Sequence, residues 1–142
     1  MLLVIDTDVV IAALRSRTGA SAELIRQILQ GRVRIALSVA MVLEYEAVAT
    51  RAEQLAASGL TGDEALVVID ALASVAQQVE NHFRWRPQLR DAGDEIILES
   101  AVNAGADAIV TFNKRDFAGA VKSFGLELYA PREILEILRS LP

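Results

Sequence analysis

The strongest constraint on the fold is a set of short apolar segments that alternate with longer stretches of helical periodicity. The apolar segments cover residues 2–5, 33–37, 108–111 and 126–129. Runs of this length are typical of strands that are buried on both faces of a parallel sheet. Residues with helical spacing occupy 21–29, 38–55, 61–78, 91–105 and 132–141. This alternation predicts an α/β fold in which helices cover both faces of a parallel sheet.

The size and composition of the chain fit a single domain over residues 1–142. Hydrophobic residues make up 53% of the chain and charged residues 23%, which is far from the composition of disordered proteins. The absence of cysteine excludes a disulfide scaffold and a thiolate zinc site. No apolar run approaches the roughly 18 residues of a membrane span, and Asp6 interrupts the stretch that a signal peptide would need. We therefore expect a soluble, cytoplasmic protein.

Acidic residues stand where such a sheet would bind a ligand, beyond the carboxyl ends of its strands. Two of them follow the first apolar segment, and another follows the segment at 108–111. The candidates are Asp6, Asp8, Glu44, Asp91, Asp94, Glu95 and Asp116. Clustered carboxylates repel one another unless a cation lies among them, and Mg²⁺ takes oxygen ligands. A group of these acids is therefore a candidate site for a divalent cation.

Each acid also has a purely structural explanation. Whether the functional or the structural explanation is favoured differs from one acid to the next. Asp6 lies at the exit of a buried strand, and Glu44 has apolar neighbours on its predicted helix, so both favour a functional role. Capping of the following helix is the favoured role for Asp8. Asp116 lies beside two basic residues and is equally explained as a loop acid.

The acids near residue 91 are explained by helix structure when only their spacing is considered. Asp91 is a natural N-cap, and Asp94 falls in the first turn, where the helix dipole favours a negative charge. Glu95 fits the exposed face of the same helix. Thr61 and Glu64 match the pattern of a capping box at the start of another helix.

The chain carries 14 Lys and Arg against 19 Asp and Glu, a net charge of −5, whereas many nucleic-acid binders are basic. Several cations nevertheless stand close to the acids, and some alternate with aromatic residues: Arg84, Arg86, Arg90, Lys114 and Arg115. Such a mixture suits a phosphate backbone with unstacked bases, and it suits surface ion pairs equally well. The single histidine, His82, argues against a histidine-dependent nuclease or a catalytic triad. Glycine-rich nucleotide-binding motifs are absent.

Four segments in order resemble the PIN-domain family. They are VIDTDVVIAAL at the start, LSVAMVLEYEAVATR, RDAGDEIILESAVNAGADAIVTFNKRDF and YAPREIL near the end. The third segment is the most specific, because an acidic helix start precedes an Ala-Gly-Ala-Asp strand entry and the pattern I-V-T-x-N-x-x-D-F. Within the family, the chain is most similar to the VapC-like toxins of toxin–antitoxin pairs.

The resemblance implies a three-layer α/β/α fold and ribonuclease activity that depends on Mg²⁺ or Mn²⁺. It also implies a small antitoxin as a partner and a homodimer. The four catalytic and metal-binding acids would be Asp6, Glu44, Asp94 and Asp116, which reverses the spacing-based interpretation of Asp94. Auxiliary roles would fall to Asp8, Asp91, Glu95, Thr111 and Asn113.

One position departs from the family pattern, and the position of the fourth acid is left open. Asp8 stands where relatives usually carry asparagine, and an additional carboxylate there would raise metal affinity or alter the position of the substrate. Some relatives carry an acid at the position of Asn113, so either Asn113 or Asp116 marks the fourth acidic position.

Two other functions remain open at this stage. Haloacid-dehalogenase-like phosphatases also carry Asp-x-Asp after the first strand and use the first Asp as a nucleophile. Thr111 and Lys114 match that arrangement, but no glycine follows Asp8 and no acidic pair follows a later strand. The second alternative is a PIN-like domain without catalysis that binds RNA or protein, against which the complete set of four acids counts.

Overall fold

The structure is a computed structural model that describes residues 1–80 and 91–141. Its centre is a five-stranded sheet with the order β3-β2-β1-β4-β5, in which every neighbouring pair is parallel. The strands are β1 (Leu2–Ile5), β2 (Arg34–Leu37), β3 (Gln77–Gln78), β4 (Ala108–Val110) and β5 (Glu127–Tyr129). All four residues of β1 are buried, because the strand is central and helices cover both of its faces.

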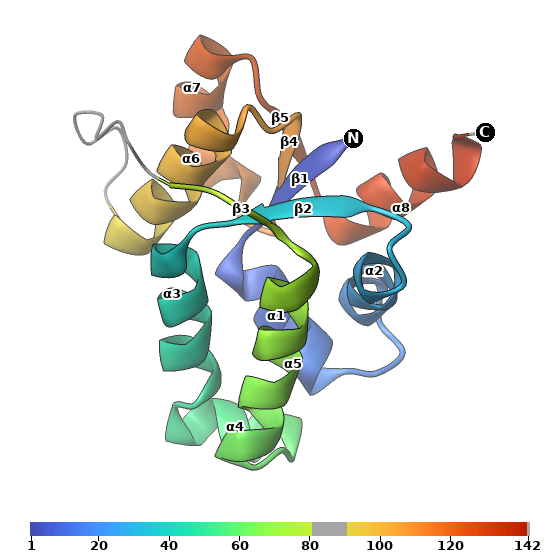
Figure 1. Cartoon of the computed structure of the whole chain (residues 1–142), viewed down its shortest axis with the longest axis vertical. Coiled ribbons are helices and arrows are strands. Elements are labelled where there is room, and N and C mark those ends of the chain that lie inside the picture. Colours follow the sequence, from blue (N-terminus) through green and yellow to red (C-terminus); the bar gives the residue numbers. More distant parts are fainter. Residues whose placement is uncertain (81–90, 142) are drawn as a thin grey trace.

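Helices flank the sheet and complete an α/β fold of three layers. They are α1 (Thr7–Arg15), α2 (Ala20–Leu29), α3 (Val39–Ala49), α4 (Ala52–Ser58), α5 (Gly62–Val75), α6 (Ala92–Ala104), α7 (Lys114–Val121) and α8 (Pro131–Ser140), with a 3₁₀ turn, η1 (Lys122–Phe124), after α7. Figure 1 shows α6 and α7 on one side of the sheet and α1, α2 and α5 on the other. The predicted fold class is therefore confirmed.

The order of the strands creates a switch point beside β1. The chain passes from β1 to β2 on one side and later to β4 on the other. Because the connections diverge there, the carboxyl ends of β1 and β4 are left uncovered by a crossover, which is the usual ligand position in open parallel sheets. The carboxyl end of β1 is joined to β4 by the bond from the Asp6 N–H to the Val110 carbonyl, at 2.9 Å.

Four predicted helix boundaries were confirmed by the residues at the helix ends. Thr61 and Glu64 form the expected capping box at the start of α5. Asp91 is the N-cap of α6, and Gly105 ends that helix with a φ of +63°, a conformation that glycine adopts without steric cost. Pro131 opens α8, where its missing N–H costs no helical hydrogen bond.

Other boundaries differ from the predictions. The helix expected over 38–55 is divided into α3 and α4, because Thr50 bonds back to the Glu46 carbonyl and Arg51 is extended. The helix expected over 61–78 ends at Val75, and Gln77–Gln78 instead pairs with β2 as an edge strand. A pair of exposed glutamines carries no apolar alternation, so the pattern could not indicate this strand. Asp116, interpreted as a possible loop acid, lies in the first turn of α7.

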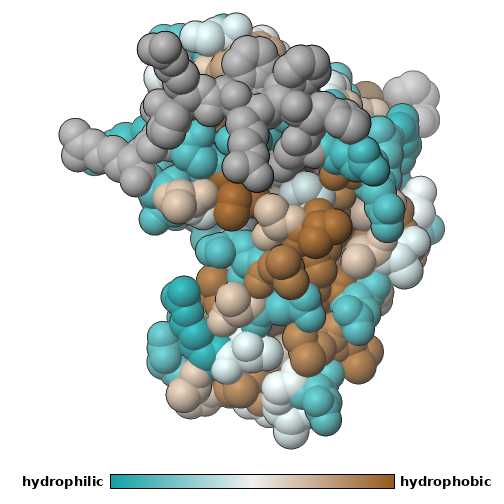
Figure 2. All heavy atoms as spheres, turned by 60° about the vertical axis from the view of Figure 1, so that its left-hand side comes forward, coloured by the Kyte–Doolittle hydropathy of each residue, from teal (hydrophilic) through white to brown (hydrophobic). Residues whose placement is uncertain are grey.

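Exposed apolar side chains are concentrated on α3 and α5. Val39, Leu43 and Val67 are 76%, 60% and 66% exposed. Nearby, Leu37, Val42 and other residues line a hollow of about 230 Å³. Figure 2 shows apolar side chains gathered on one face of the molecule. We refer to Val39, Leu43 and Val67 below as the apolar patch. None of the described helices is long and apolar enough to cross a membrane.

Candidate active site

Asp6 is the buried centre of the polar residues at the carboxyl ends of β1 and β4. Its side chain is only 5% exposed and both of its oxygens accept hydrogen bonds. Oδ1 accepts the Thr7 N–H at 2.8 Å, so Asp6 is the N-cap of α1. Oδ2 accepts the hydroxyl of Thr111 at 2.7 Å. These two bonds fix the carboxylate between the first strand and a residue that is 105 positions away in the sequence.

Asp8 lies in the first turn of α1 and faces the end of β4. Its Oδ2 accepts the Phe112 N–H at 3.1 Å and the side-chain amide of Asn113 at 3.0 Å. Its Oδ1 is buried and has no hydrogen-bond partner among the described residues. The prediction that Asp8 caps the helix was therefore wrong, because Asp6 takes that role and Asp8 instead binds the loop after β4.

Glu44 and Asp91 approach each other across Gly93. A Cβ atom at residue 93 would lie 3.0 Å from Asp91 Oδ1 and 3.1 Å from Glu44 Oε1, so these side chains would have to shift by a few tenths of an ångström to accept it. Asp91 Oδ1 also accepts the Asp94 N–H at 3.1 Å as the cap of α6. The absence of a side chain at residue 93 thus allows the carboxylates of α3 and α6 to come together.

A buried tyrosine fixes α3 relative to the first strand. Tyr45 is 1% exposed, and its hydroxyl donates to the carbonyl of Ile5, the residue before Asp6. Because Tyr45 follows Glu44 in the same helix, this bond sets the position of Glu44 relative to Asp6. Burial, together with the negative charges of Asp6 and Asp8, raises the pKa of Tyr45 well above its usual value.

These side chains line a cleft of about 420 Å³. Five of the predicted acids and one predicted amide line it, and residues of α1, α3, α4 and α6 form the rest of the wall. The lining consists of Asp6, Thr7, Asp8, Ile11, Ala12, Arg15, Glu44, Val48, Gln54, Asp91, Gly93, Asp94 and Asn113. Thr111 is buried behind Asp6. Asp116 is exposed in the first turn of α7, and neither it nor Glu95 is among the lining residues.

Burial and mutual repulsion disfavour the ionised form of several carboxyl groups in the cleft. Burial, and then the charge of Asp8, raise the pKa of Asp6 from 3.8 to about 7. Burial also raises the pKa of Asp8. The pKa of Asp94 rises to about 6, first through burial and then through the charges of Asp6, Asp91, Asp116 and Glu44. Although Asp116 is outside the cleft lining, its charge is thus felt at Asp94.

The chemistry of these residues fits a hard divalent cation. Carboxylate and amide oxygens are its preferred ligands, and a cation would relieve the repulsion that raises these pKa values. The unpartnered Oδ1 of Asp8 is a further available donor. Among the described residues, however, no three acidic side chains are already arranged as a group of ligands.

Of the predicted basic residues, Lys114 and Arg115 are described, and neither is among the residues that line the cleft. Lys114 is paired with Glu133 of α8, and Arg115 is exposed in α7. Arg84, Arg86 and Arg90 lie outside the described residues.

The cleft has a cation that the sequence interpretation missed, Arg15. A signal for it exists, because Asp8, Ile11, Ala12 and Arg15 follow the i, i+3, i+4, i+7 spacing of one helix face. Extending the predicted helix after Asp8 by two turns would have placed Arg15 on the same side as the acid. Gln54, another missed residue, is brought to the cleft by the break between α3 and α4, for which no sequence pattern was evident.

The hydroxyl of Thr111 should contribute to the free energy of unfolding when Asp6 is ionised. It donates to Asp6 and accepts the Asn113 N–H at 2.9 Å, so Thr111→Val leaves a buried acceptor and a backbone donor without this partner. We expect a loss of about 1–3 kcal/mol in the free energy of unfolding at pH 8. Urea denaturation followed by circular dichroism measures the change. Thr111→Ser, which keeps the hydroxyl, is the control, and equal losses in the two variants would contradict the role of the hydroxyl.

Comparison with known proteins gives a family and no individual relative. A family model described as "PIN domain" matches residues 2–115. No curated protein and no solved structure matches the chain. The matched range includes the whole cleft lining described above, from Asp6 to Asn113.

Proposed function

The chain belongs to the PIN-domain family, whose members are generally nucleases that use divalent metal ions and act on nucleic acids, and we propose that it is an endoribonuclease dependent on Mg²⁺ or Mn²⁺. The observation that carries this proposal is the convergence of five carboxylates from β1, α1, α3 and α6 on one cleft. The raised pKa values of Asp6 and Asp94 support it, because such a group of acids gains stability by binding a cation.

In this proposal, Asp6, Glu44, Asp94 and Asp116 would hold the ion. When bound, such an ion supplies Lewis-acid activation of water and neutralises charge on the leaving oxygen. Thr111 and the N-cap bond keep the carboxylate of Asp6 in one orientation. Asp8 and Asn113 keep the loop after β4 beside α1. Tyr45 and Gly93 allow Glu44 to face these groups.

Asn113 and Asp116 have different parts in the proposal. Asn113 lines the cleft and is bonded to Asp8, so it orients the site as it stands. Asp116 is the fourth acid, and its support is the effect of its charge on the pKa of Asp94. Asp91 and Glu95 are proposed as auxiliary residues of the first turn of α6. The arginines Arg84, Arg86, Arg90 and Arg115, together with Lys114, are proposed to contact RNA.

We also propose that the protein is the cytoplasmic toxin of a toxin–antitoxin pair and forms a homodimer. The sequence resemblance to VapC-like toxins is the basis for this part. The apolar patch supports a protein partner, since exposed apolar surface of this kind commonly marks interaction sites. A small gene next to the coding sequence would be the expected source of the antitoxin.

Cleavage of RNA in the presence and absence of metal tests the proposed reaction directly. We expect purified protein to cut a labelled RNA internally with Mg²⁺ or Mn²⁺, and to lose this activity in EDTA and regain it on addition of Mn²⁺. Mapping of the new RNA ends by sequencing distinguishes internal cuts from trimming. RNA binding without cleavage under every metal condition would favour a non-catalytic domain. A phosphate burst from a phosphomonoester would favour a phosphatase that uses Asp6.

Induced expression in a bacterial host extends the same test to the toxin role. The wild type should stop growth and generate new RNA ends, whereas the Asp6→Asn variant should do neither. Equal growth of the two strains with no new ends would contradict the toxin proposal.

A further inference from the structure

Arg15 stands at the far end of the cleft wall that begins with the acids. Among the described residues that line the cleft, it is the only cation. The lining residues of α1 run from Asp8 through Ile11 and Ala12 to Arg15 along one face of the helix. A rise of 1.5 Å per residue separates the first and last of these by about 10 Å along the helix axis. The wall therefore changes from a carboxylate to apolar side chains and then to a guanidinium.

The guanidinium of Arg15 is held in place while most of its donors stay available. Its Nε donates to Gln54 Oε1 of α4 at 2.9 Å. Within residues 1–80 and 91–141, no acceptor is recorded for its two terminal nitrogens and no carboxylate pairs with it. An arginine held by one neutral bond at the edge of a cleft keeps its full charge for a ligand.

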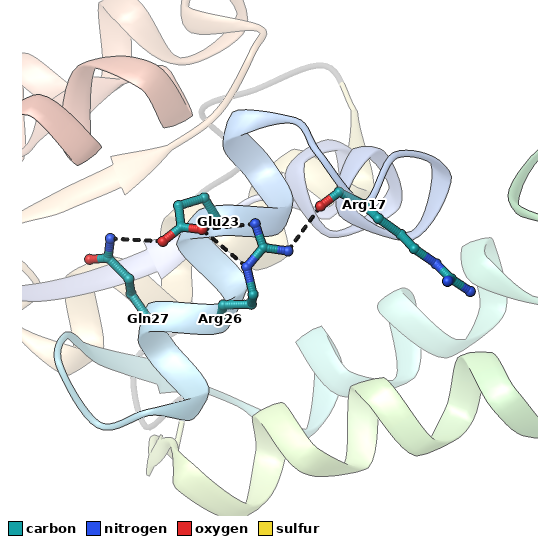
Figure 3. Close-up of polar contacts among 4 residues, drawn as sticks. All are labelled: Arg17, Glu23, Arg26 and Gln27. Atoms are coloured by element: carbon teal, nitrogen blue, oxygen red, sulfur yellow. Dashed lines mark hydrogen bonds and ion pairs between the residues drawn. The ribbon is translucent and has the colours of Figure 1, made fainter.

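Arg26 shows the opposite situation, with its donors occupied by the protein itself. Its Nε and Nη2 donate to Glu23 at 3.0 and 2.8 Å, and its Nη1 donates to the carbonyl of Arg17 at 2.9 Å (Figure 3). Gln27 donates to the second oxygen of the same glutamate. The side chain of Arg26 thus serves the local structure of α2, outside the cleft, and is a matched control for the charge of Arg15.

We propose that Arg15 binds a backbone phosphate of the RNA at a position at least one nucleotide away from the phosphodiester that meets the acids. This inference rests on the proposed nuclease function. Asp8 and Arg15 are separated by about 10 Å along the axis of α1. The guanidinium of Arg15 is bonded to Gln54 of α4, so we assign the two ends of the wall to different phosphates. The apolar wall between them, formed by Ile11, Ala12 and Val48, suits a ribose or a base between two phosphates. The substrate class is therefore a nucleotide chain, and a mononucleotide cannot use both ends of the cleft.

A structural role for Arg15 makes a different prediction. The bond between Arg15 and Gln54 also joins the end of α1 to α4, and a cation in the last turn interacts favourably with the helix dipole. If joining α1 to α4 were the whole role, Gln54→Ala would have the same effect on RNA binding as Arg15→Gln. A phosphate contact requires instead that Gln54→Ala keeps the charge and most of the binding.

The dependence of RNA binding on salt separates these roles. The affinity for a labelled single-stranded RNA is measured in Mg²⁺ by fluorescence anisotropy at several salt concentrations. Two proteins are compared, Asp94→Asn and the double variant Asp94→Asn/Arg15→Gln, and both carry the Asp94 substitution so that the RNA is not cleaved during the measurement. Loss of one phosphate contact should reduce the slope of log K against log salt by about 0.7. Arg15→Lys should retain the slope, and Arg26→Gln, which removes the same charge outside the cleft, should not change it.

Cleavage supplies a second measurement on proteins with Asp94 intact. Arg15→Gln should lower kcat/KM about tenfold on an oligonucleotide, the loss expected for one charge-assisted hydrogen bond. It should have little effect on a dinucleotide, which has no second phosphate to reach Arg15. Thermal unfolding checks that each variant is folded.

The outcomes distinguish this inference from the nuclease proposal. An unchanged salt slope in Arg15→Gln, or an equal reduction in Gln54→Ala, would overturn the phosphate contact even if the wild type cleaves RNA. A reduced slope without cleavage by the wild type would support the contact and refute the nuclease proposal.

Discussion

Replacement of Asp94 by asparagine is expected to lower metal-dependent RNA cleavage by about a thousandfold or more while the protein stays folded. A bound metal contributes several kcal/mol to the stabilisation of a transition state, and each 1.4 kcal/mol or so is a factor of ten in rate. Asparagine keeps the shape of the side chain but cannot supply the negative charge that holds the ion. The cap of α6 is unaffected, since Asp91 binds the backbone N–H of residue 94.

Stability should change little in this variant. The pKa of Asp94 is raised to about 6 by burial and neighbouring acids, so the ionised group is not stabilising at pH 8. The favourable interaction with the helix dipole, about 0.3–1 kcal/mol, is lost at the same time. Asp63→Asn is the control, because Asp63 is an acid in the first turn of α5 that does not line the cleft. Cleavage by Asp94→Asn at the rate of this control would refute the assignment of Asp94.

Asp6→Asn should raise the free energy of unfolding at pH 8 in the absence of metal, and it should abolish RNA cleavage. The pKa of Asp6 is about 7 in the folded protein against 3.8 in an exposed carboxyl. Between these values, the folded chain keeps a proton that the unfolded chain releases, so the free energy of unfolding falls as pH rises through this window. At about 1.4 kcal/mol per pKa unit, the ionised group costs up to about 4 kcal/mol at pH 8.

Asparagine removes this cost and can keep the local hydrogen bonds. Its amide oxygen can accept the Thr7 N–H, and its amide nitrogen can donate to the hydroxyl of Thr111. Because this exchange will not be perfect, we expect a net gain of about 1–3 kcal/mol at pH 8 and a much smaller gain at pH 4.

Urea unfolding in EDTA at both pH values measures this difference. The comparison of variant with wild type is needed because exposed acids with lowered pKa values, such as Glu23 and Glu64, shift stability in the opposite direction. Mg²⁺ should then stabilise the wild type and leave Asp6→Asn unchanged, since a ligand stabilises only a folded state that binds it. A variant that is less stable than the wild type at pH 8 would contradict the destabilising role of the Asp6 charge.

The sequence was sufficient for four of the five strands and for most of the helices because burial leaves a strong pattern. Residues 2–5 have the pattern of a strand buried on both faces, which predicts that the residues after them lie at the carboxyl edge of the sheet. The caps at Thr61 and Asp91 were equally direct, because one side chain determines each. The edge strand Gln77–Gln78 was missed because its backbone, not its side chains, makes the pairing.

The sequence predicted most of the residues that line the cleft, but it did not predict which of them contact one another. Spacing identified Asp6 but assigned the helix cap to Asp8, since the two residues are both suitable and only the path of the chain decides between them. Asp94 was recognised only through family resemblance, because first-turn acids are common in helices. Arg15 was missed because its relation to the acids arises from the position of α1 in the fold.

Because β1 pairs with β4, the cleft can be complete only after β4 has been synthesised. Asp6 and Asp8 are synthesised before Thr111 and Asn113, which orient them and follow 105 positions later in the sequence. Contacts over such distances in sequence also form late in folding, because the intervening chain must first be ordered. A nascent chain that ends before β4 therefore holds its acids without the groups that arrange them. If the proposed nuclease needs this arrangement, we expect cleavage only after β4 and the loop that follows it have been synthesised.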